Sequence, residues 1–249
     1  MDVRVRERLT QREGKNVNKQ LHHLKQSIGK HDRKIRLTSH FVMAFALFVV
    51  FSTLFIKLAK DVRELETASF DKAVLTAING WSTSLLDTVI PVVTNFGGAF
   101  IVIALTFVLA GLFVYKREYY RAMVVLVGVG GASVLNLILK AIFERPRPTL
   151  WERIVVEHGF SFPSGHAMAS AALGVALAVA LWNSRWRWWA FTTAAAYIVI
   201  IGFTRLYLGV HYPTDIVAGW FVSIAWVMAV ALLFNTRLAR SVLERRKKR

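Results

Sequence analysis

Residues 215–234 read DIVAGWFVSIAWVMAVALLF, an apolar run with a single charge at its first position. An α-helix of about 20 apolar residues is long enough to cross the roughly 30 Å hydrocarbon core of a bilayer. Similar runs recur along the chain of 249 residues, which is 55% hydrophobic with a mean hydropathy of +0.44. The sequence therefore predicts an integral membrane protein rather than a soluble domain.

The apolar runs predict an all-α fold, a bundle of six transmembrane helices. The spans are expected at residues 41–58, 98–115, 122–142, 165–183, 189–207 and 215–234. The stretch 61–96 mixes apolar and acidic residues, and we expect it to form short interfacial helices between the first and second spans. Spans three to five are rich in Gly and Ala, which allow helices to pack closely, so these spans should form the inner bundle.

The charged segments predict the organisation and the topology of the chain. We expect a basic tail at 1–37, the six-helix membrane domain at 38–234 and a second basic tail at 235–249. The first tail is interpreted as part helix and part disordered, with a surface helix or a polybasic segment held by anionic lipid as the alternative. Because basic loops stay in the cytoplasm, we expect both termini there, in a multi-pass protein of the cell (inner) membrane.

The composition of the chain also limits which partners and which reactive groups it can have. The net charge of +17 could indicate nucleic-acid binding, but the basic residues lie at span ends and in short loops, so no nucleic-acid partner is expected. The chain has no cysteine, which excludes disulfides, thiolate metal sites and cysteine nucleophiles.

Three segments at the outer ends of the spans concentrate polar residues of one chemical kind. The residues are Lys140, Arg147, Ser164, Gly165, His166, Arg205, His211 and Asp215. Charged side chains beside membrane spans are costly, at about 2.5–3.5 kcal/mol each at a helix centre, so they usually serve a function. Three cations and the free N–H groups where the fourth span begins at Gly165 predict a phosphate-binding pocket.

Two histidines and a carboxylate predict what this pocket does. Asp215 lies one helical turn after His211, so it can orient the imidazole as a nucleophile toward phosphorus. His166 is then the general acid that protonates the leaving group. We expect no metal and no cofactor, because fixed cations supply the electrostatic stabilisation.

These strings resemble the three-part signature of the type 2 phosphatidic acid phosphatase (PAP2) superfamily. They are Lys140-x6-Arg147-Pro148, Pro163-Ser164-Gly165-His166 and Arg205-x5-His211-x3-Asp215. The resemblance covers roughly residues 70–234, and it departs at Thr204, where the family more often has Ser. It implies a six-helix phosphatase with a periplasm-facing site that acts through a phosphohistidine without metal. It also implies that Lys140, Arg147, Ser164, Gly165 and Arg205 bind phosphate.

Simpler interpretations exist for single residues. Lys140 and Arg205 could be interfacial anchors, and Ser164 could be only the N-cap of its helix. Arg145 and Arg153 are interpreted as rim or lipid-facing charges. Asn136 is expected to form a hydrogen bond between helices rather than to bind ligand.

The leading hypothesis is a membrane lipid phosphatase that acts at the periplasmic or extracellular face. Its expected partners are membrane lipids and a lipid phosphate or diphosphate, such as undecaprenyl diphosphate, phosphatidylglycerophosphate, phosphatidate or a lipid A phosphate. The alternatives are a lipid phosphotransferase that uses the same site and a catalytically silent membrane scaffold.

Overall fold

The computed structural model describes residues 41–151 and 155–234. The predicted basic tails at 1–37 and 235–249, and Arg153, lie outside the described residues. The chain divides into two compact units, Met1–Met43 and Ala44–Arg249. Only residues 41–43 of the first unit are described, and they are helical. The account below concerns the second unit.

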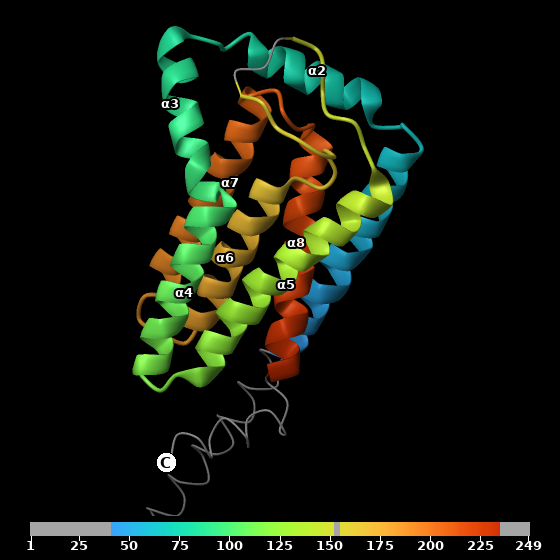
Figure 1. Ribbon diagram of the computed structural model, residues 1–249. Coiled ribbons are helices and arrows are strands. Elements are labelled where there is room, and N and C mark those ends of the chain that lie inside the picture. The colour runs from blue at the N-terminus through green and yellow to red at the C-terminus, as the bar shows by residue number, and fades with distance from the viewer. Residues whose placement is uncertain (1–40, 152–154, 235–249) are drawn as a thin grey trace, which may run out of the picture. The chain divides into compact units, whose positions relative to one another are not determined.

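All regular structure in the described ranges is helical, which confirms the predicted all-α class. A first helix, Phe41–Arg63, precedes the labelled elements. They are α2 (Ala68–Asn79), α3 (Ser84–Thr94), the 3₁₀ turn η1 (Asn95–Gly97), α4 (Ala99–Tyr115), α5 (Tyr119–Phe143), α6 (Gly165–Leu181), α7 (Arg187–Tyr207) and α8 (Pro213–Phe234). Figure 1 shows α4 to α8 side by side in a bundle, with α2 running across one end.

Four of the described helices are long and apolar enough to cross a membrane: Phe41–Arg63, α5, α7 and α8. The pair formed by Ser84–Gly97 and α4 makes a fifth if it is one span, bent by 44°. The apolar helix α6 has 17 residues. The structure thus has four or five candidate spans by length and composition, and the count of six stays a prediction.

The segment expected to be interfacial contains two different helices. α2 crosses the bundle end, as an interfacial helix would (Figure 1). α3 packs against α7 and continues through η1 toward α4, so its interfacial placement stays a prediction. The acidic residue Asp87 of α3 has a partner within the fold, since the Tyr207 hydroxyl donates to its Oδ1 at 2.6 Å.

Small residues place α6 at the centre of the bundle. It packs against α4, α5, α7 and α8, and its Ala167, Ala171, Ala172 and Ala176 are fully buried. Without large side chains, neighbouring helices approach closely. Close packing at a small residue also joins α5 to α8, since a Cβ on Gly131 would lie 2.2 Å from Cζ2 of Trp226.

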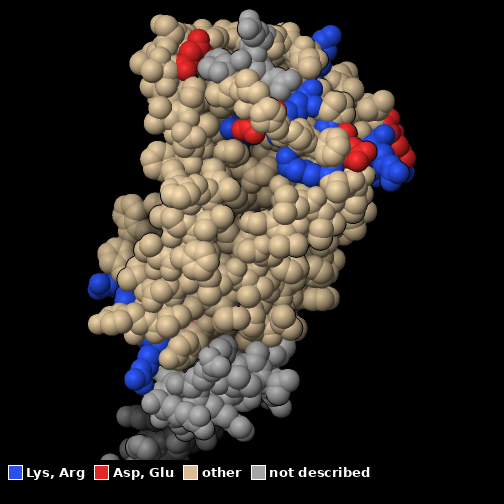
Figure 2. Space-filling view, viewed as in Figure 1, with Lys and Arg blue, Asp and Glu red and all other residues tan. Residues whose placement is uncertain are grey.

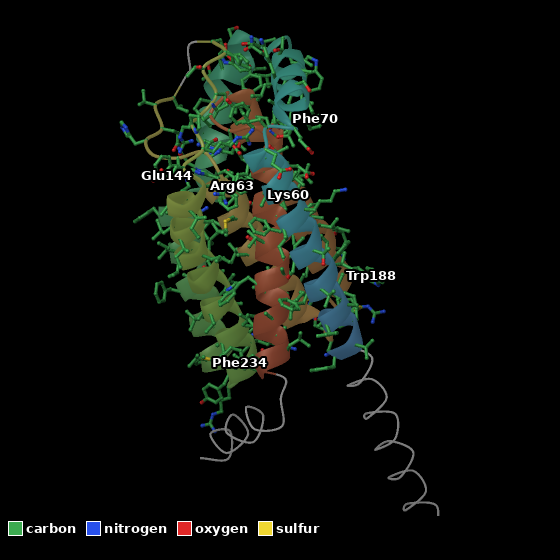
Figure 3. The ribbon with its side chains drawn as sticks, turned by 90° about the vertical axis from the view of Figure 1, so that its right-hand side faces the viewer. Lys60, Arg63, Phe70, Glu144, Trp188 and Phe234 are labelled. Carbon is green, nitrogen blue, oxygen red and sulfur yellow. The ribbon has the colours of Figure 1, made fainter. Side chains whose placement is uncertain are left out.

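The connections between helices lie at the two opposite ends of the bundle. Figure 3 shows Glu144, which follows α5, at the same end as Lys60 and Arg63, whereas Trp188 near the start of α7 and Phe234 at the end of α8 lie toward the other end. On the face shown in Figure 2, most acidic and basic side chains gather at the end that α2 crosses, above a largely uncharged flank. The three polar motifs belong to this end.

Candidate active site

The first motif runs from the last turn of α5 into the connection that leads to α6. The Lys140 ammonium donates to the main-chain carbonyl of Phe160 at 2.5 Å. Arg147 donates to the carbonyls of His158, Gly159 and Val210, each at 3.0 Å. The Arg147 guanidinium therefore joins both ends of the α5–α6 connection to the α7–α8 turn.

The second motif begins α6. Ser164 is the N-cap of this helix, because its backbone is extended and its hydroxyl accepts from the Ala167 N–H at 3.5 Å. The Ser164 N–H donates to the main-chain carbonyl of Asp215 at 3.1 Å. The start of α6 is thus fastened to the start of α8, and the second and third motifs meet.

The third motif brings His211 and Asp215 together as the four-residue spacing predicts. Nδ1 of His211 lies 3.4 Å from Oδ2 of Asp215, and both side chains are buried. The same Oδ2 accepts from the Tyr212 N–H at 2.8 Å and from the Ser161 hydroxyl, whose oxygen lies 3.3 Å from His211 Nδ1. On the far side of the ring, Arg147 Nη1 lies 3.1 Å from Nε2.

Arg205, at the end of α7, is one of the most buried side chains of the described residues, at 1% exposure. Its Nη1 donates to the Thr94 hydroxyl of α3 at 2.9 Å, and its Nη2 pairs with the Glu157 carboxylate. Its Nε is buried and has no hydrogen-bond partner among the described residues. Buried donors are normally satisfied, so an unpaired N–H here is the kind of group that a bound anion would satisfy. Thr204, the departure from the family pattern, also donates to Thr94, at 3.0 Å.

Glu157 connects the two arginines. Its Oε1 pairs with Arg205, and its Oε2 lies 3.7 Å from Arg147 Nη2. Burial raises the pKa of Glu157, but Arg205 and Arg147 outweigh it and hold the pKa below its ordinary value. An ionised carboxylate therefore rests between the two cations, in a place suited to an anion.

His166, in the first turn of α6, faces this group of charges. It lies within electrostatic range of Arg205, Glu157 and His211. Its Nε2 would lie 3.7 Å from a Cβ on Gly98, the N-cap of α4. Lys140 interacts electrostatically with Arg147, Glu157 and Asp215. The structure thus gathers all eight predicted residues at one end, with Gly165 adjoining both Ser164 and His166 in the chain.

The electrostatics favour a neutral imidazole. Burial lowers the pKa of His211 to about 4, although Asp215 acts in the opposite direction. Arg147 Nη1 can only donate, so Nε2 accepts and the ring proton resides on Nδ1, toward Asp215. A lone pair on Nε2 beside an arginine is the arrangement required of a nucleophile toward an anionic centre.

Arg145 corrects the sequence interpretation. It is not a rim or lipid-facing charge: its side chain is 12% exposed, with Nη1 2.6 Å from Asp215 Oδ1 and Nη2 2.7 Å from Asp71 Oδ2. Sequence reasoning also missed Glu157, Ser161 and Thr94, which no motif marks. The prediction for Asn136 is confirmed, since its Nδ2 donates to the Pro163 carbonyl at 3.1 Å and contacts Met168 Sδ on α6.

The chemistry of the site is that of fixed cations around an anion. Across the described ranges, no three His, Asp or Glu side chains are grouped as a metal ion would require. The groups gathered here are guanidinium and ammonium donors, two imidazoles and the start of α6.

Comparison with known proteins identifies the family of this chain. The family model described as PAP2 superfamily matches residues 121–239. Phosphatidylglycerophosphatase B of Bacillus subtilis (strain 168) is 31% identical over 172 residues, which cover 67% of this chain and 84% of that protein. This chain belongs to the PAP2 superfamily. The resemblance predicted from the three motifs is confirmed.

Other members of the PAP2 superfamily match over much of the chain. Undecaprenyl-diphosphatase BcrC of B. subtilis (strain 168) is 26% identical over 156 residues, covering 59% of this chain and 76% of that protein. The crystal structure of a transmembrane PAP2-type phosphatidylglycerolphosphate phosphatase from B. subtilis aligns with a TM-score of 0.67 and 28% identity. The aligned residues cover 74% of this chain and 93% of the B. subtilis chain. Together with the apolar helices, this structure supports a membrane protein.

Proposed function

We propose that this protein is a membrane lipid phosphatase that cleaves a phosphomonoester or diphosphate through a phosphohistidine on His211. One observation carries the proposal: Arg147 and Arg205 converge on the Glu157 carboxylate, and Arg147 also touches Nε2 of His211. An anion seat therefore adjoins a nucleophilic nitrogen. Membership of the PAP2 superfamily and relatives named as lipid phosphatases support the same activity.

The proposed reaction has two steps. In the first, the substrate phosphate displaces Glu157 and is bound by Lys140, Arg147, Arg205, the Ser164 hydroxyl and the N–H group of Gly165. Nε2 of His211 attacks phosphorus, and the bond from phosphorus to the lipid oxygen breaks as His166 donates its proton to that oxygen. Asp215 stabilises the positive charge that develops on the His211 ring.

In the second step, His166 accepts a proton from a water molecule whose oxygen attacks phosphorus. The bond from phosphorus to nitrogen breaks, and inorganic phosphate leaves. Each residue then returns to its starting protonation state. The proposal needs no metal, because three fixed cations balance the phosphate charge.

The proposed topology has six spans: Phe41–Arg63, the bent α3–α4 pair, α5, α6, α7 and α8. The α4–α5 and α6–α7 turns carry Lys116, Arg117 and Arg185, and they lie at the end opposite the site (Figure 1). By the positive-inside rule these turns are cytoplasmic, so the site opens at the outer face of the cell membrane. A lipid whose phosphate lies at that surface can reach it with its tails still in the bilayer.

The test is phosphate release from a panel of purified lipids in detergent micelles: undecaprenyl diphosphate, phosphatidylglycerophosphate, phosphatidate and a lipid A phosphate. We expect release from at least one, and its loss in His211→Ala protein that expresses and unfolds as the wild type does. Radiolabelled phosphate that moves to a second lipid without appearing in solution would indicate a phosphotransferase. Equal activity of the wild type and His211→Ala would overturn the proposal.

A further inference from the structure

Arg145 lies between two carboxylates from distant parts of the chain. Nη1 donates to Asp215 Oδ1 at 2.6 Å, and Nη2 donates to Asp71 Oδ2 at 2.7 Å. The guanidinium carbon lies 4.1 Å from the centre of the Tyr212 ring, and Nη1 also reaches the Thr214 hydroxyl at 2.8 Å. Such a planar fork holds two acceptors in fixed directions, which a lysine cannot do.

Asp71 anchors this arrangement from α2. It is fully buried, and its Oδ1 accepts from the Thr214 N–H at 3.1 Å. Its Oδ2 accepts from the Thr214 hydroxyl at 2.7 Å and from Thr67 at 3.2 Å, in addition to Arg145. A buried carboxylate is tolerated only when it is paired and hydrogen-bonded, as this one is. The helix that crosses the bundle end is thereby joined to the first turn of α8.

The two oxygens of Asp215 have separate partners. Oδ1 accepts from Arg145, whereas Oδ2 accepts from Ser161 and the Tyr212 N–H and lies nearest to His211 Nδ1. Rotation of the carboxylate about its Cβ–Cγ bond would break the contact with Arg145. Arg145 therefore determines which oxygen the imidazole meets.

We propose that Arg145 is a positioning residue for catalysis, held by Asp71 of α2, which fixes the orientation of the Asp215 carboxylate toward His211. This inference rests on the proposed phosphatase function. It assigns α2 a part in the site, although α2 carries none of the three motifs and precedes the matched family residues 121–239.

The charge of Arg145 is permanent. Burial lowers its pKa, but Asp215 and Asp71 outweigh this effect and raise the pKa above its ordinary value. The charged and polar groups that face His211 are Asp215 of α8, Arg205 of α7, His166 of α6, and Arg147 and Ser161 of the α5–α6 connection. Without Arg145, Asp215 would lose its nearest counter-charge and would stabilise the protonated His211 ring more strongly.

The experiment compares Arg145→Gln with Arg121→Gln, a control that also loses an ion pair, with Glu118 at 2.7 Å, but at the other end of α5. We expect Arg145→Gln to lower kcat about 10–100-fold, the range typical when a residue that orients a metal-binding side chain is lost. KM should change less than about twofold, because the groups proposed to bind phosphate are untouched. The acid limb of kcat against pH should move to higher pH. Arg145→Lys should recover only part of kcat, and Arg121→Gln should behave as the wild type.

Asp71→Asn tests the second half of the proposal. Alone it should lower kcat less than Arg145→Gln does, and in the Arg145→Gln background it should have little further effect, because both act through one chain of contacts. Vanadate affinity and thermal unfolding in detergent identify variants that fail only by misfolding. A misfolded variant should lose vanadate binding, whereas a misaligned Asp215 should not.

The outcomes separate the two proposals. If the wild type releases phosphate and Arg145→Gln keeps its kcat and pH profile, the positioning role is wrong and the phosphatase function stands. The positioning role is also wrong if the effects of Asp71→Asn and Arg145→Gln on kcat multiply in the double variant. It is equally wrong if Arg145→Gln changes KM and kcat to the same extent and loses vanadate binding. If the wild type is inactive on every lipid phosphate, both proposals fall.

Discussion

Nη1 of Arg147 lies 3.1 Å from Nε2 of His211. Because a guanidinium group has no acceptor, this contact fixes the imidazole as the tautomer with its proton on Nδ1. The same guanidinium donates to the carbonyls of Gly159 and Val210, so its position is set by the main chain on both sides. One side chain thus places a positive charge and selects Nε2 as the ring nitrogen that carries the lone pair.

Arg147→Lys should therefore be a severe change although the charge is kept. A lysine cannot make these several contacts at once, so we expect kcat to fall by about 100-fold or more, as when a donor to a developing anion is removed. Steady-state assays with the best lipid of the panel provide the measurement. Activity within threefold of the wild type would show that charge alone suffices.

On the acid side, kcat/KM should begin to fall only at a pH well below the ordinary pKa of histidine. The pKa of His211 is lowered to about 4 by burial, so the ring stays neutral and reactive at every pH above that value. We expect kcat/KM to stay level above this value and to fall on the acid side as pH approaches about 4. An acid limb centred near the ordinary histidine value of about 6.5 would contradict the assignment.

The lowered pKa of His211 also predicts how the stability of the fold depends on pH. The folded His211 has a pKa below that of the unfolded chain, so only the unfolded chain takes up a proton between about pH 6.5 and 4. Its contribution to stability is complete above pH 6.5 and is lost as pH falls through this window. Thermal unfolding in detergent should show a smaller loss over this window in His211→Gln than in the wild type.

Glu157→Gln should improve substrate binding. The carboxylate occupies Arg205 and approaches Arg147, and it is 27% exposed, so a substrate phosphate has to displace a partly solvated ion pair. An amide competes less well, and we expect KM to fall about 2–5-fold, equivalent to an ion pair worth up to about 1 kcal/mol. Vanadate inhibition should tighten in parallel. A rise in KM would instead show that Glu157 assists the substrate.

Removal of divalent metal should leave the activity intact. Lys140, Arg147 and Arg205 supply positive charge at the proposed phosphate seat, so dialysis against EDTA should change kcat by less than twofold. The measurement is phosphate release before and after dialysis, with magnesium added back as the control. Loss of activity that magnesium restores would rule out catalysis by the fixed cations alone.

Gly209→Ala should weaken the turn that carries His211. Gly209 has φ +64°, a conformation that costs other residues about 1–2 kcal/mol. A Cβ there would also lie 2.7 Å from Cζ2 of Trp151. We expect a lower unfolding temperature and a lower kcat together. Gly111→Ala serves as the control, because nothing lies within 4 Å of a Cβ at that position.

Much of this architecture could be predicted from the sequence because the signals are local. Apolar runs mark the helices, and the spacing of His211 and Asp215 is the one that joins side chains across one helical turn. The Gly- and Ala-rich composition of α6 indicated its inner position. These features depend on neighbouring residues only.

The rest depends on partners far apart in the chain. In the sequence, Arg145 resembles an ordinary charged residue of a loop. Its partner Asp71 lies 74 residues earlier and meets it only in the folded chain. Glu157 and Thr94 meet Arg205 only in three dimensions. Asp87 accepts from the Tyr207 hydroxyl, which lies 120 residues away in the chain.

The buried carboxylate on α2 also limits how such enzymes can be recombined. A chimera that takes residues 121–239 from this protein and the preceding helices from a relative would receive every motif residue. If the donor of those helices lacks an acid at the place of Asp71, the imported Arg145 would be enclosed with only one of its two counterions. Exchanges between relatives should therefore keep α2 and the α5–α6 connection from the same parent.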